Sequence, residues 1–332
     1  MIRPALSLLL LAHAAACAPV TTAIPPRAIV EGECRLSAAD QAWLDDSMDA
    51  WAYTSREITK VGNVEKIRGV FFDAGCMLVS DTAMNGGPKL WRATRHNRQV
   101  QVPNGPKIPA DVISFAMGGE DAEQFVMSTP SIWRAANKSD NGLGSLEKLM
   151  TVVVIHEGTH VAQIPTYGQK IGTLAEAHNL PDDFNDDSIQ KRFQGNAEFT
   201  ASIERETELL FAAADAANDA AAKRLAREAR ELMRARHRRW FTGPDIYLTA
   251  ADDIWLTMEG SAQWAAYQWA IDPRGGAVPP ERTQFRTGRW WSQVQGFALF
   301  MALDRIADDS WKRHAFGDAA KTGLQMLDEA IG

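Results

Sequence analysis

Apolar residues follow two different periods along the chain. Between positions 69 and 128 they form short runs separated by turn-like breaks, such as 70–72 and 77–79 on either side of 73–75. Such runs are typical of paired strands. After about position 196 the apolar residues recur at helical spacing. Strands followed by helices predict an α+β fold, with a small mixed sheet before a mainly helical C-terminal part.

Two further segments extend the predicted sheet. Residues 100–106 read as a strand that ends in a Pro-Asn-Gly-Pro turn, and 125–128 read as a strand shortly before an apolar helix. An extended substrate can add to a sheet along an exposed edge strand. Residues 125–128 are the candidate edge, and a wholly covered strand is the equal alternative.

The predicted helices flank and follow this sheet. Residues 37 to about 57 place Trp43, Leu44, Met48 and Trp51 on one side of a helix. Residues 164 to about 194 are rich in Pro, Gly, Asp and Asn, which predicts a long loop with at most short helices, beside a cleft. The remaining helices are expected at 196–240, 251–271, 290–306 and 319–331.

One five-residue motif in the sequence predicts a metal-binding site. His156-Glu157-Gly158-Thr159-His160 sets two imidazoles one helical turn apart on the same face, where both can bind one metal ion. Glu157 then lies near the open side of that metal and can take a proton from a water. This arrangement is typical of a zinc hydrolase.

The alternative is a chance motif with two satisfied core histidines. Against it, the apolar residues of 146–155 run directly into the motif, and Ser145 can cap that helix. A histidine pair at the end of a buried helix needs partners for its ring nitrogens, and a metal supplies them.

A catalytic zinc site usually has three protein ligands. The metzincin pattern is excluded, because Gln163 and Thr166 stand where it carries Gly and His. Glu176 lies in a turn-rich stretch and fits the thermolysin-like pattern poorly. Two predicted helices can supply the third carboxylate: 196–240, with Glu204 or Glu206, and 251–271, with Glu259. Gly260 and Ala262 would let the helix of Glu259 approach the motif helix closely.

Residues 255–262 resemble the Glu-Gly-x-Ala segment of gluzincin metallopeptidases, whose Glu is the third zinc ligand. The resemblance covers two short motifs in the catalytic half, and their separation is longer than in compact gluzincins. It implies Zn²⁺ held by His156, His160 and Glu259, with Glu157 as the catalytic base in peptide-bond hydrolysis. Possible oxyanion donors are Tyr267, Tyr247 and His237, and Asp252 or Asp253 could partner a ligand histidine.

The first residues predict export. Arg3, an apolar core at 6–11 and small residues up to Cys17 form a signal peptide over 1–17, with lipid attachment at Cys17 or ordinary cleavage as open alternatives. The expected location is the periplasm, the outer membrane through a lipid anchor, or the medium. A linker at 18–36 then leads to one domain over 37–332, with 37–165 holding the strands and motif helix and 195–332 the helical part.

The charge and cysteine content of the chain limit which binding partners are expected. A formal net charge of −7 gives no sign of nucleic-acid binding, and the Arg-rich run at 224–239 reads as a solvated helix face rather than a polyanion site. Cys34 and Cys76 form either one disulfide or two buried thiols. The expected partner is a peptide or protein substrate. The alternatives are a non-catalytic binding lipoprotein of zincin fold and a zinc hydrolase of some non-peptide amide.

Overall fold

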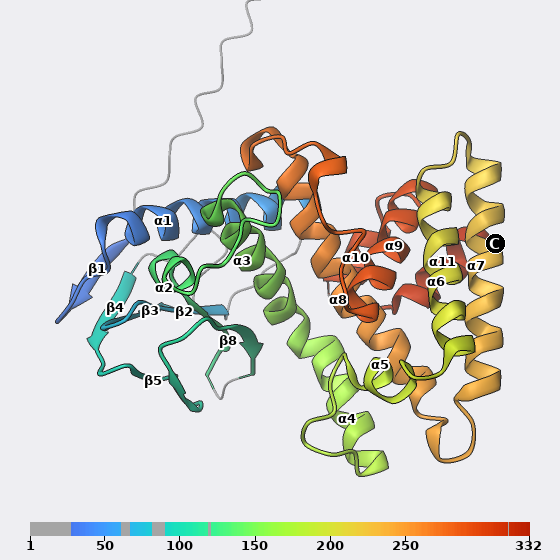
Figure 1. Cartoon of the computed structure of the whole chain (residues 1–332), viewed down its shortest axis with the longest axis horizontal. Helices are drawn as coiled ribbons and strands as arrows, with labels where there is room; N and C mark the ends of the chain where they lie inside the picture. The colour runs from blue at the N-terminus through green and yellow to red at the C-terminus, as the bar shows by residue number, and fades with distance from the viewer. Residues whose placement is uncertain (1–27, 61–66, 82–89, 119–120, 318) are drawn as a thin grey trace, which may run out of the picture.

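A computed structural model describes residues 28–60, 67–81, 90–118, 121–317 and 319–332. The predicted signal peptide, Cys17 and most of the predicted linker lie outside the described residues. At one end of the molecule is a β-sheet, and at the other a bundle of helices (Figure 1). The fold class is α+β, as predicted.

A mixed sheet of six strands forms the N-terminal part, in the order β1-β4-β3-β2-β8-β7. The central strands β2 and β3 form an antiparallel hairpin that pairs Val70 with Val79, and the carboxylate of Asp73 accepts hydrogen bonds from the two backbone amides that close the turn. Strand β8 pairs in parallel with β2. The strands are β1 (Ile29–Gly32), β2 (Ile67–Phe72), β3 (Cys76–Ser80), β4 (Leu90–Arg95), β7 (Ser114–Met117) and β8 (Glu123–Ser128).

Of the two alternatives for 125–128, the edge strand is wrong and the covered strand is confirmed. Strand β8 lies between β2 and β7, and Phe125, Val126 and Met127 are fully buried. A continuous apolar run is what a strand covered on both faces requires. The edge strand is β7, whose four residues are all partly exposed and gave no clear signal in the sequence.

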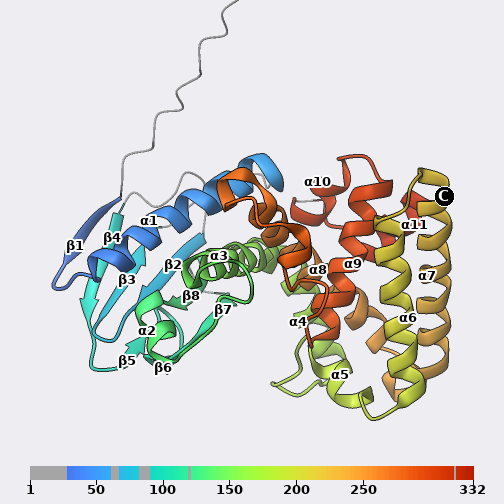
Figure 2. The ribbon, with the colours of Figure 1, turned by 45° about the horizontal axis from the view of Figure 1, so that its top comes forward.

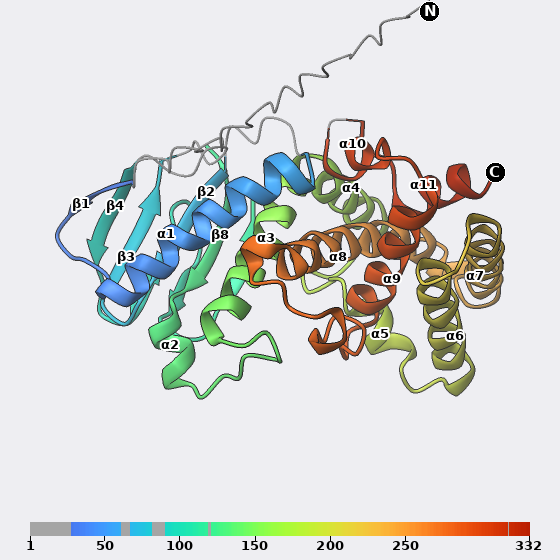
Figure 3. The same cartoon turned by 90° about the horizontal axis from the view of Figure 1, so that it is seen from above.

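Successive side chains along the strands point to opposite faces of the sheet, so this part of the molecule has two hydrophobic cores, one on each face. Phe71, Leu78 and Phe125 face helices α1 (Ala38–Tyr53) and α3 (Leu146–Gln163). Val70 and Phe72 face the opposite side, which the small hairpin of β5 (Gln99–Gln101) and β6 (Lys107–Pro109) covers. Figure 3 shows α1 lying across the strands and α3 between the sheet and the bundle.

Two local features fix these helices to the sheet. A disulfide joins Cys34, just before α1, to Cys76 at the start of β3, which confirms the predicted pair. Gly158 lies where α3 crosses α1, and a Cβ there would come within 2.8 Å of the Trp51 ring. The glycine inside the motif therefore permits the two helices to approach.

The motif helix does not end in a loop as predicted. Its backbone continues from α3 through a π-helical turn, Ile164–Gly168, into α4 (Gln169–His178), and only then ends at Asn179 in the left-handed conformation. The N–H of Ile164 donates to the carbonyls of both His160 and Val161, so the carbonyls that Pro165 cannot reach already have a donor. A loop and the short helix α5 (Ser188–Phe193) follow.

The helical part contains one break that the sequence analysis missed. Residues 196–240 form two antiparallel helices, α6 (Ala197–Ala214) and α7 (Asp219–Trp240), rather than one (Figures 1 and 2). Asn218 caps α7 by accepting a hydrogen bond from the amide of Ala221. Alanine-rich sequence on both sides concealed this cap, because alanine favours helix on either side of a break.

Helix α8 (Leu248–Ile271) crosses the middle of the molecule and is buried on most of its faces. It packs on α3 and on α9 (Trp291–Ile306), and α11 (Gly323–Ile331) closes the bundle. The short helices α2 (Pro130–Ala135) and α10 (Trp311–Phe316) were not predicted. No helix in the described part of the chain is both long and apolar enough to cross a bilayer.

Candidate metal centre

His156 and His160 meet Glu259 where α3 crosses α8. The Nε2 atoms of the two histidines are 3.0 Å apart. The Glu259 carboxylate lies 3.1 Å from Nε2 of His160 and 3.5 Å from Nε2 of His156. One ligand atom from each of the three residues falls within 4.8 Å of the others. The three residues predicted as metal ligands are therefore brought together from α3 and α8, two helices far apart in the sequence.

A hydrogen-bond chain orients the ring of His160. The Ser261 hydroxyl donates to the carbonyl of Thr257 at 2.7 Å, so its oxygen is left to accept from the Gln163 amide nitrogen at 2.6 Å. The Gln163 oxygen then lies 3.3 Å from Nδ1 of His160 and accepts its proton. A neutral His160 consequently carries its lone pair on Nε2, which points at Glu259 and His156.

Nothing in the sequence indicated that Gln163 and Ser261 would orient His160, because their contact forms only where α3 packs on α8. The small residues near Glu259 also act differently from the prediction. Gly260 lies against Gly296 of α9, where a Cβ would come within 2.3 Å of the neighbouring carbonyl, and it is Ser261 that contacts the motif helix.

Burial and nearby charges shift the pKa values of Glu259 and His160 in opposite directions. Burial alone would raise the pKa of Glu259, but the charges and hydrogen bonds of His160 and His156 outweigh it and hold that pKa well below its usual range. Burial alone would lower the pKa of His160, and the charges of Glu259 and Glu157 with the hydrogen bond to Glu259 instead raise it to about 9. The cluster thus holds a carboxylate that requires a nearby positive charge.

A divalent cation fits these donors. Within the described residues, Oε2 of Glu259 is buried without a hydrogen-bond partner. Two imidazole nitrogens facing one another beside a carboxylate are unfavourable without a proton or a metal between them. Two imidazoles and one carboxylate form a ligand set that zinc uses in catalytic sites, where a fourth position stays open.

Glu157 is placed beside this centre. Together with His156 it lines a cavity of about 370 Å³ at the surface of the molecule. Ser114 of the edge strand β7 lines the same cavity. The predicted base, one predicted ligand and the exposed edge of the sheet therefore share one opening.

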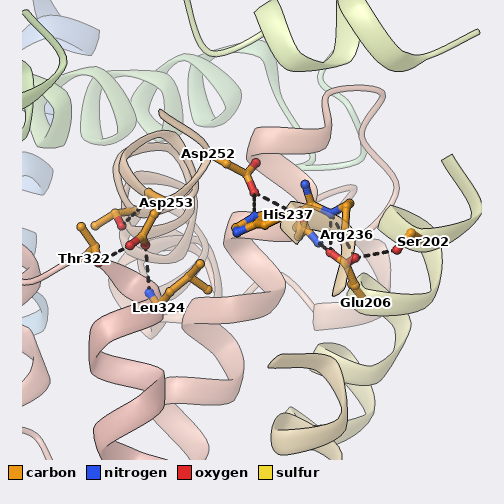
Figure 4. A network of polar contacts seen from close by, with 10 residues as sticks. Ser202, Glu206, Arg236, His237, Asp252, Asp253, Thr322 and Leu324 are labelled. Atoms are coloured by element: carbon orange, nitrogen blue, oxygen red, sulfur yellow. Dashed lines mark hydrogen bonds and ion pairs between the residues drawn. The ribbon is translucent and has the colours of Figure 1, made fainter. Parts of the chain in front are cut away.

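The alternative third ligands lie elsewhere. Glu204 is exposed on α6. Glu206 is fully buried, but its carboxylate accepts hydrogen bonds from Arg236 at 3.0 Å and from Ser202 and Gln295 at 2.8 Å (Figure 4). Of the three glutamates, only Glu259 faces the histidine pair.

The predicted auxiliary residues do not reach the centre. His237 lies 2.8 Å from Asp252, and Asp253 accepts hydrogen bonds from Thr322 and Leu324, so neither aspartate partners His156 or His160 (Figure 4). Tyr267 packs against Phe285 and Phe297, and Tyr247 against His178 and Phe184. Spacing along α8 did not reveal that these side chains point into other clusters. None of them lines the cavity.

One acidic residue near the centre was not predicted. Asp186 lies in the loop between α4 and α5, where burial and the charge of Glu259 raise its pKa to about 6. A loop bordering a cleft was expected in this region, but nothing in its composition distinguished Asp186 from Asp182, Asp183 or Asp187.

Compared with known proteins, the chain matches no family model, no curated protein and no solved structure.

Proposed function

We propose that this protein is an exported zinc-dependent metallopeptidase. The observation that carries the proposal is the convergence of His156, His160 and Glu259, with Glu157 beside them in a surface cavity. The disulfide between Cys34 and Cys76 supports an oxidising compartment outside the cytoplasm. Membrane association would come only through lipid attachment at Cys17.

The residues of the chain have separate roles in this proposal. Zinc held by His156, His160 and Glu259 would lower the pKa of a bound water and polarise the substrate carbonyl. Glu157 accepts a proton from the attacking water and then delivers it to the nitrogen of the leaving amine, so one carboxylate acts first as base and then as acid. Gln163 keeps the lone pair of His160 directed at the centre.

The edge of the sheet offers a place for an extended substrate. Strand β7 pairs on one side with β8, and Ser114 on β7 also lines the cavity beside Glu157. An extended peptide can hydrogen-bond to such an edge as an additional strand. It would then pass the candidate centre in a fixed register.

The Glu157→Gln variant tests the function. Zinc content and unfolding temperature should match the wild type, while peptide cleavage should fall by about 10²–10⁴-fold, because the proton acceptor is lost. Glu147→Gln is the matched control, since Glu147 lies on the same helix but pairs with Arg134 at the surface. Cleavage of a peptide library is measured with and without a chelator.

The outcomes separate the alternatives. Cleavage by Glu157→Gln at the wild-type rate would refute the role of Glu157. Zinc binding with no cleavage of any peptide would favour a non-catalytic binding protein. Cleavage of other amides alone, found by product analysis on cell-wall fragments, would favour a non-peptide amide hydrolase.

A further inference from the structure

The cavity beside Glu157 has an unusual lining. Apolar side chains from α3 and the neighbouring loops form its walls, and four carboxamides face it. His156 and Glu157 are its only ionisable lining residues in the described part of the chain. The apolar residues are Leu143, Leu149, Val152, Val153, Phe285 and Val294, and the carboxamides are Asn141, Gln263, Gln284 and Gln293.

Gln263 is the carboxamide closest in sequence to the candidate centre. It follows Glu259 by four residues on α8, so both side chains project from the same face of the helix. The Gln263 side chain is half-buried. Gln284 lies in the loop before α9, and Gln293 is in the first turn of that helix. Within the described residues, none of these three side-chain amides has a hydrogen-bond partner, so their donors and acceptors are available to a ligand.

The loop that forms the outer wall is held in place. The Gln190 side chain donates to the carbonyl of Arg289 at 3.0 Å and accepts from the amide of Trp291 at 2.9 Å. The ring of Phe285 packs edge-on against Tyr267, with ring centroids 5.6 Å apart, and at a tilt against Phe297, with centroids 5.5 Å apart. A wall tied at both points gives the cavity a defined shape before a ligand binds.

The opposite rim is joined to this loop by a close backbone contact. Gly142 has a φ of +81°, and a Cβ there would come within 2.6 Å of the carbonyl oxygen of Arg282. The segment that carries Asn141 and Leu143 therefore rests on the segment that carries Gln284. The two rims of the cavity are therefore in direct contact with each other.

The lining determines which side chain is favoured. A charged side chain would lose water, and the lining residues other than those at the proposed zinc centre offer it no opposite charge, so its burial costs free energy. A carboxamide matches the lining, because its carbonyl accepts from one glutamine and its NH₂ donates to another, while its methylenes contact the apolar walls.

We propose that this cavity binds the side chain of a substrate residue next to the scissile bond, and that it selects an uncharged carboxamide side chain, with Gln263 as the specificity-determining residue. The inference rests on the proposed peptidase function, since it names the substrate class of the same site. Gln284 and Gln293 complete the set of partners.

The test compares peptides that differ at one position only. Each of the two positions that flank the cleaved bond carries Gln, Met, Glu or Lys in turn. If no peptide is cleaved, the same four residues are placed at the two central positions of one peptide of constant sequence. Two quantities are measured: kcat/KM with the wild type, and Kd with the zinc-loaded Glu157→Gln variant. Gln should be favoured over Met by about 3–10-fold, as one hydrogen bond predicts, and over Glu and Lys by at least about tenfold.

Variants at position 263 sharpen this test. Gln263→Met should abolish the preference of Gln over Met, and Gln263→Glu should shift the preference toward Lys. Gln268→Met is the matched control, because Gln268 lies on the same helix but pairs with Asp304 outside the cavity, and it should leave the ranking unchanged. Circular dichroism and zinc content verify that each variant is folded and loaded.

The results distinguish the two proposals. Equal or better binding of the Glu and Lys peptides, or an unchanged ranking in both Gln263 variants, overturns the inference. Selective binding of the Gln peptide with no cleavage by the wild type supports the carboxamide selectivity of the cavity and refutes the peptidase. Absence of both binding and cleavage refutes both.

Discussion

Helix α8 carries two buried clusters in which histidine meets carboxylate, and they are built differently. In one, Asp252 contacts His237 and the guanidinium of Arg236, which also bonds Glu206 (Figure 4). In the other, two turns further along, Glu259 faces His156 and His160, and no lysine or arginine of the described residues bonds to it. The first cluster contains its own permanent cation, and the second does not.

The presence or absence of a permanent cation distinguishes a structural cluster from a candidate metal-binding site. Burial raises the pKa of Asp252, but the Arg236 charge and the hydrogen bond from His237 outweigh it and lower the pKa to about 2. The charges of the Arg236 cluster are thereby balanced within the protein, although Nη1 of Arg236 is buried without a hydrogen-bond partner. The Glu259 cluster reaches charge balance only with a proton on a histidine or with a metal ion, and the buried Oε2 of Glu259, which has no hydrogen-bond partner, favours the metal.

Removing the cation of the structural cluster should give the largest loss of stability. Arg236→Met leaves the buried carboxylates of Glu206 and Asp252 unpaired and should lower the free energy of unfolding by about 3–5 kcal/mol. Zinc content of the folded protein should not change. Denaturant unfolding measures the first quantity and elemental analysis the second.

The matched control is Arg239→Met, three residues along the same helix. Arg239 pairs with Glu198 at the surface, where an ion pair contributes about 0–1 kcal/mol. An equal, small effect of both substitutions would show that the buried cluster is not needed for stability and would remove the contrast.

Disturbing the orientation of His160 should have a smaller effect, confined to the other cluster. Gln163→Leu removes the acceptor of the Nδ1 proton and should weaken zinc binding by about 10–100-fold. Competition with a chromophoric chelator measures this affinity. Gln169→Leu, an exposed position on the same continuous helix, should bind zinc as the wild type does. Unchanged affinity in Gln163→Leu would show that the chain from Ser261 to His160 does not tune the centre.

The smallest effect concerns Asp253, the neighbour of Asp252. Burial raises its pKa to about 6, although hydrogen bonds from Thr322 and Leu324 act in the opposite direction. Because the folded pKa lies above the unfolded value near 3.8, the contribution of Asp253 to stability is fully present below about pH 4 and is lost as the pH rises through about 6.

The Asp253→Asn variant has no such titration. The free energy of unfolding of the metal-free wild type, minus that of Asp253→Asn, should therefore fall between about pH 4 and pH 7. A difference that stays constant or rises over this interval would contradict the assigned direction. The experiment shows whether a buried carboxylate of α8 without a hydrogen-bonded guanidinium behaves unlike Asp252.

Local features of the site were predictable, and contacts across the fold were less so. The spacing of His156 and His160 fixes their common face within one helix, and Ser145 caps that helix as predicted. Glu259 was chosen through a motif resemblance. The contact of Gln163 with Ser261 and the place of Asp186 depend on how two distant segments meet, and the spacing of residues within each segment does not specify this.

The same distinction holds for the fold. The β2–β3 hairpin and the helices 251–271 and 290–306 follow from local pattern, and they appear with nearly the predicted bounds. The position of β8 inside the sheet depends on β7, a strand too short to be recognised. Pro165 and Gly168 read as helix breakers, because the sequence gives no sign that a π-helical turn will accommodate them.

Zinc binding by the chelator-treated protein tests the central claim most directly. Calorimetric titration should show one zinc ion per chain for the wild type and for Glu204→Gln, the exposed alternative ligand. The Glu259→Gln variant should lose more zinc affinity than the decrease of about 10–100-fold expected for Gln163→Leu, which removes only a partner of a ligand. A wild-type protein that binds no zinc, or a Glu259→Gln variant that binds it as tightly as the wild type, would contradict the account.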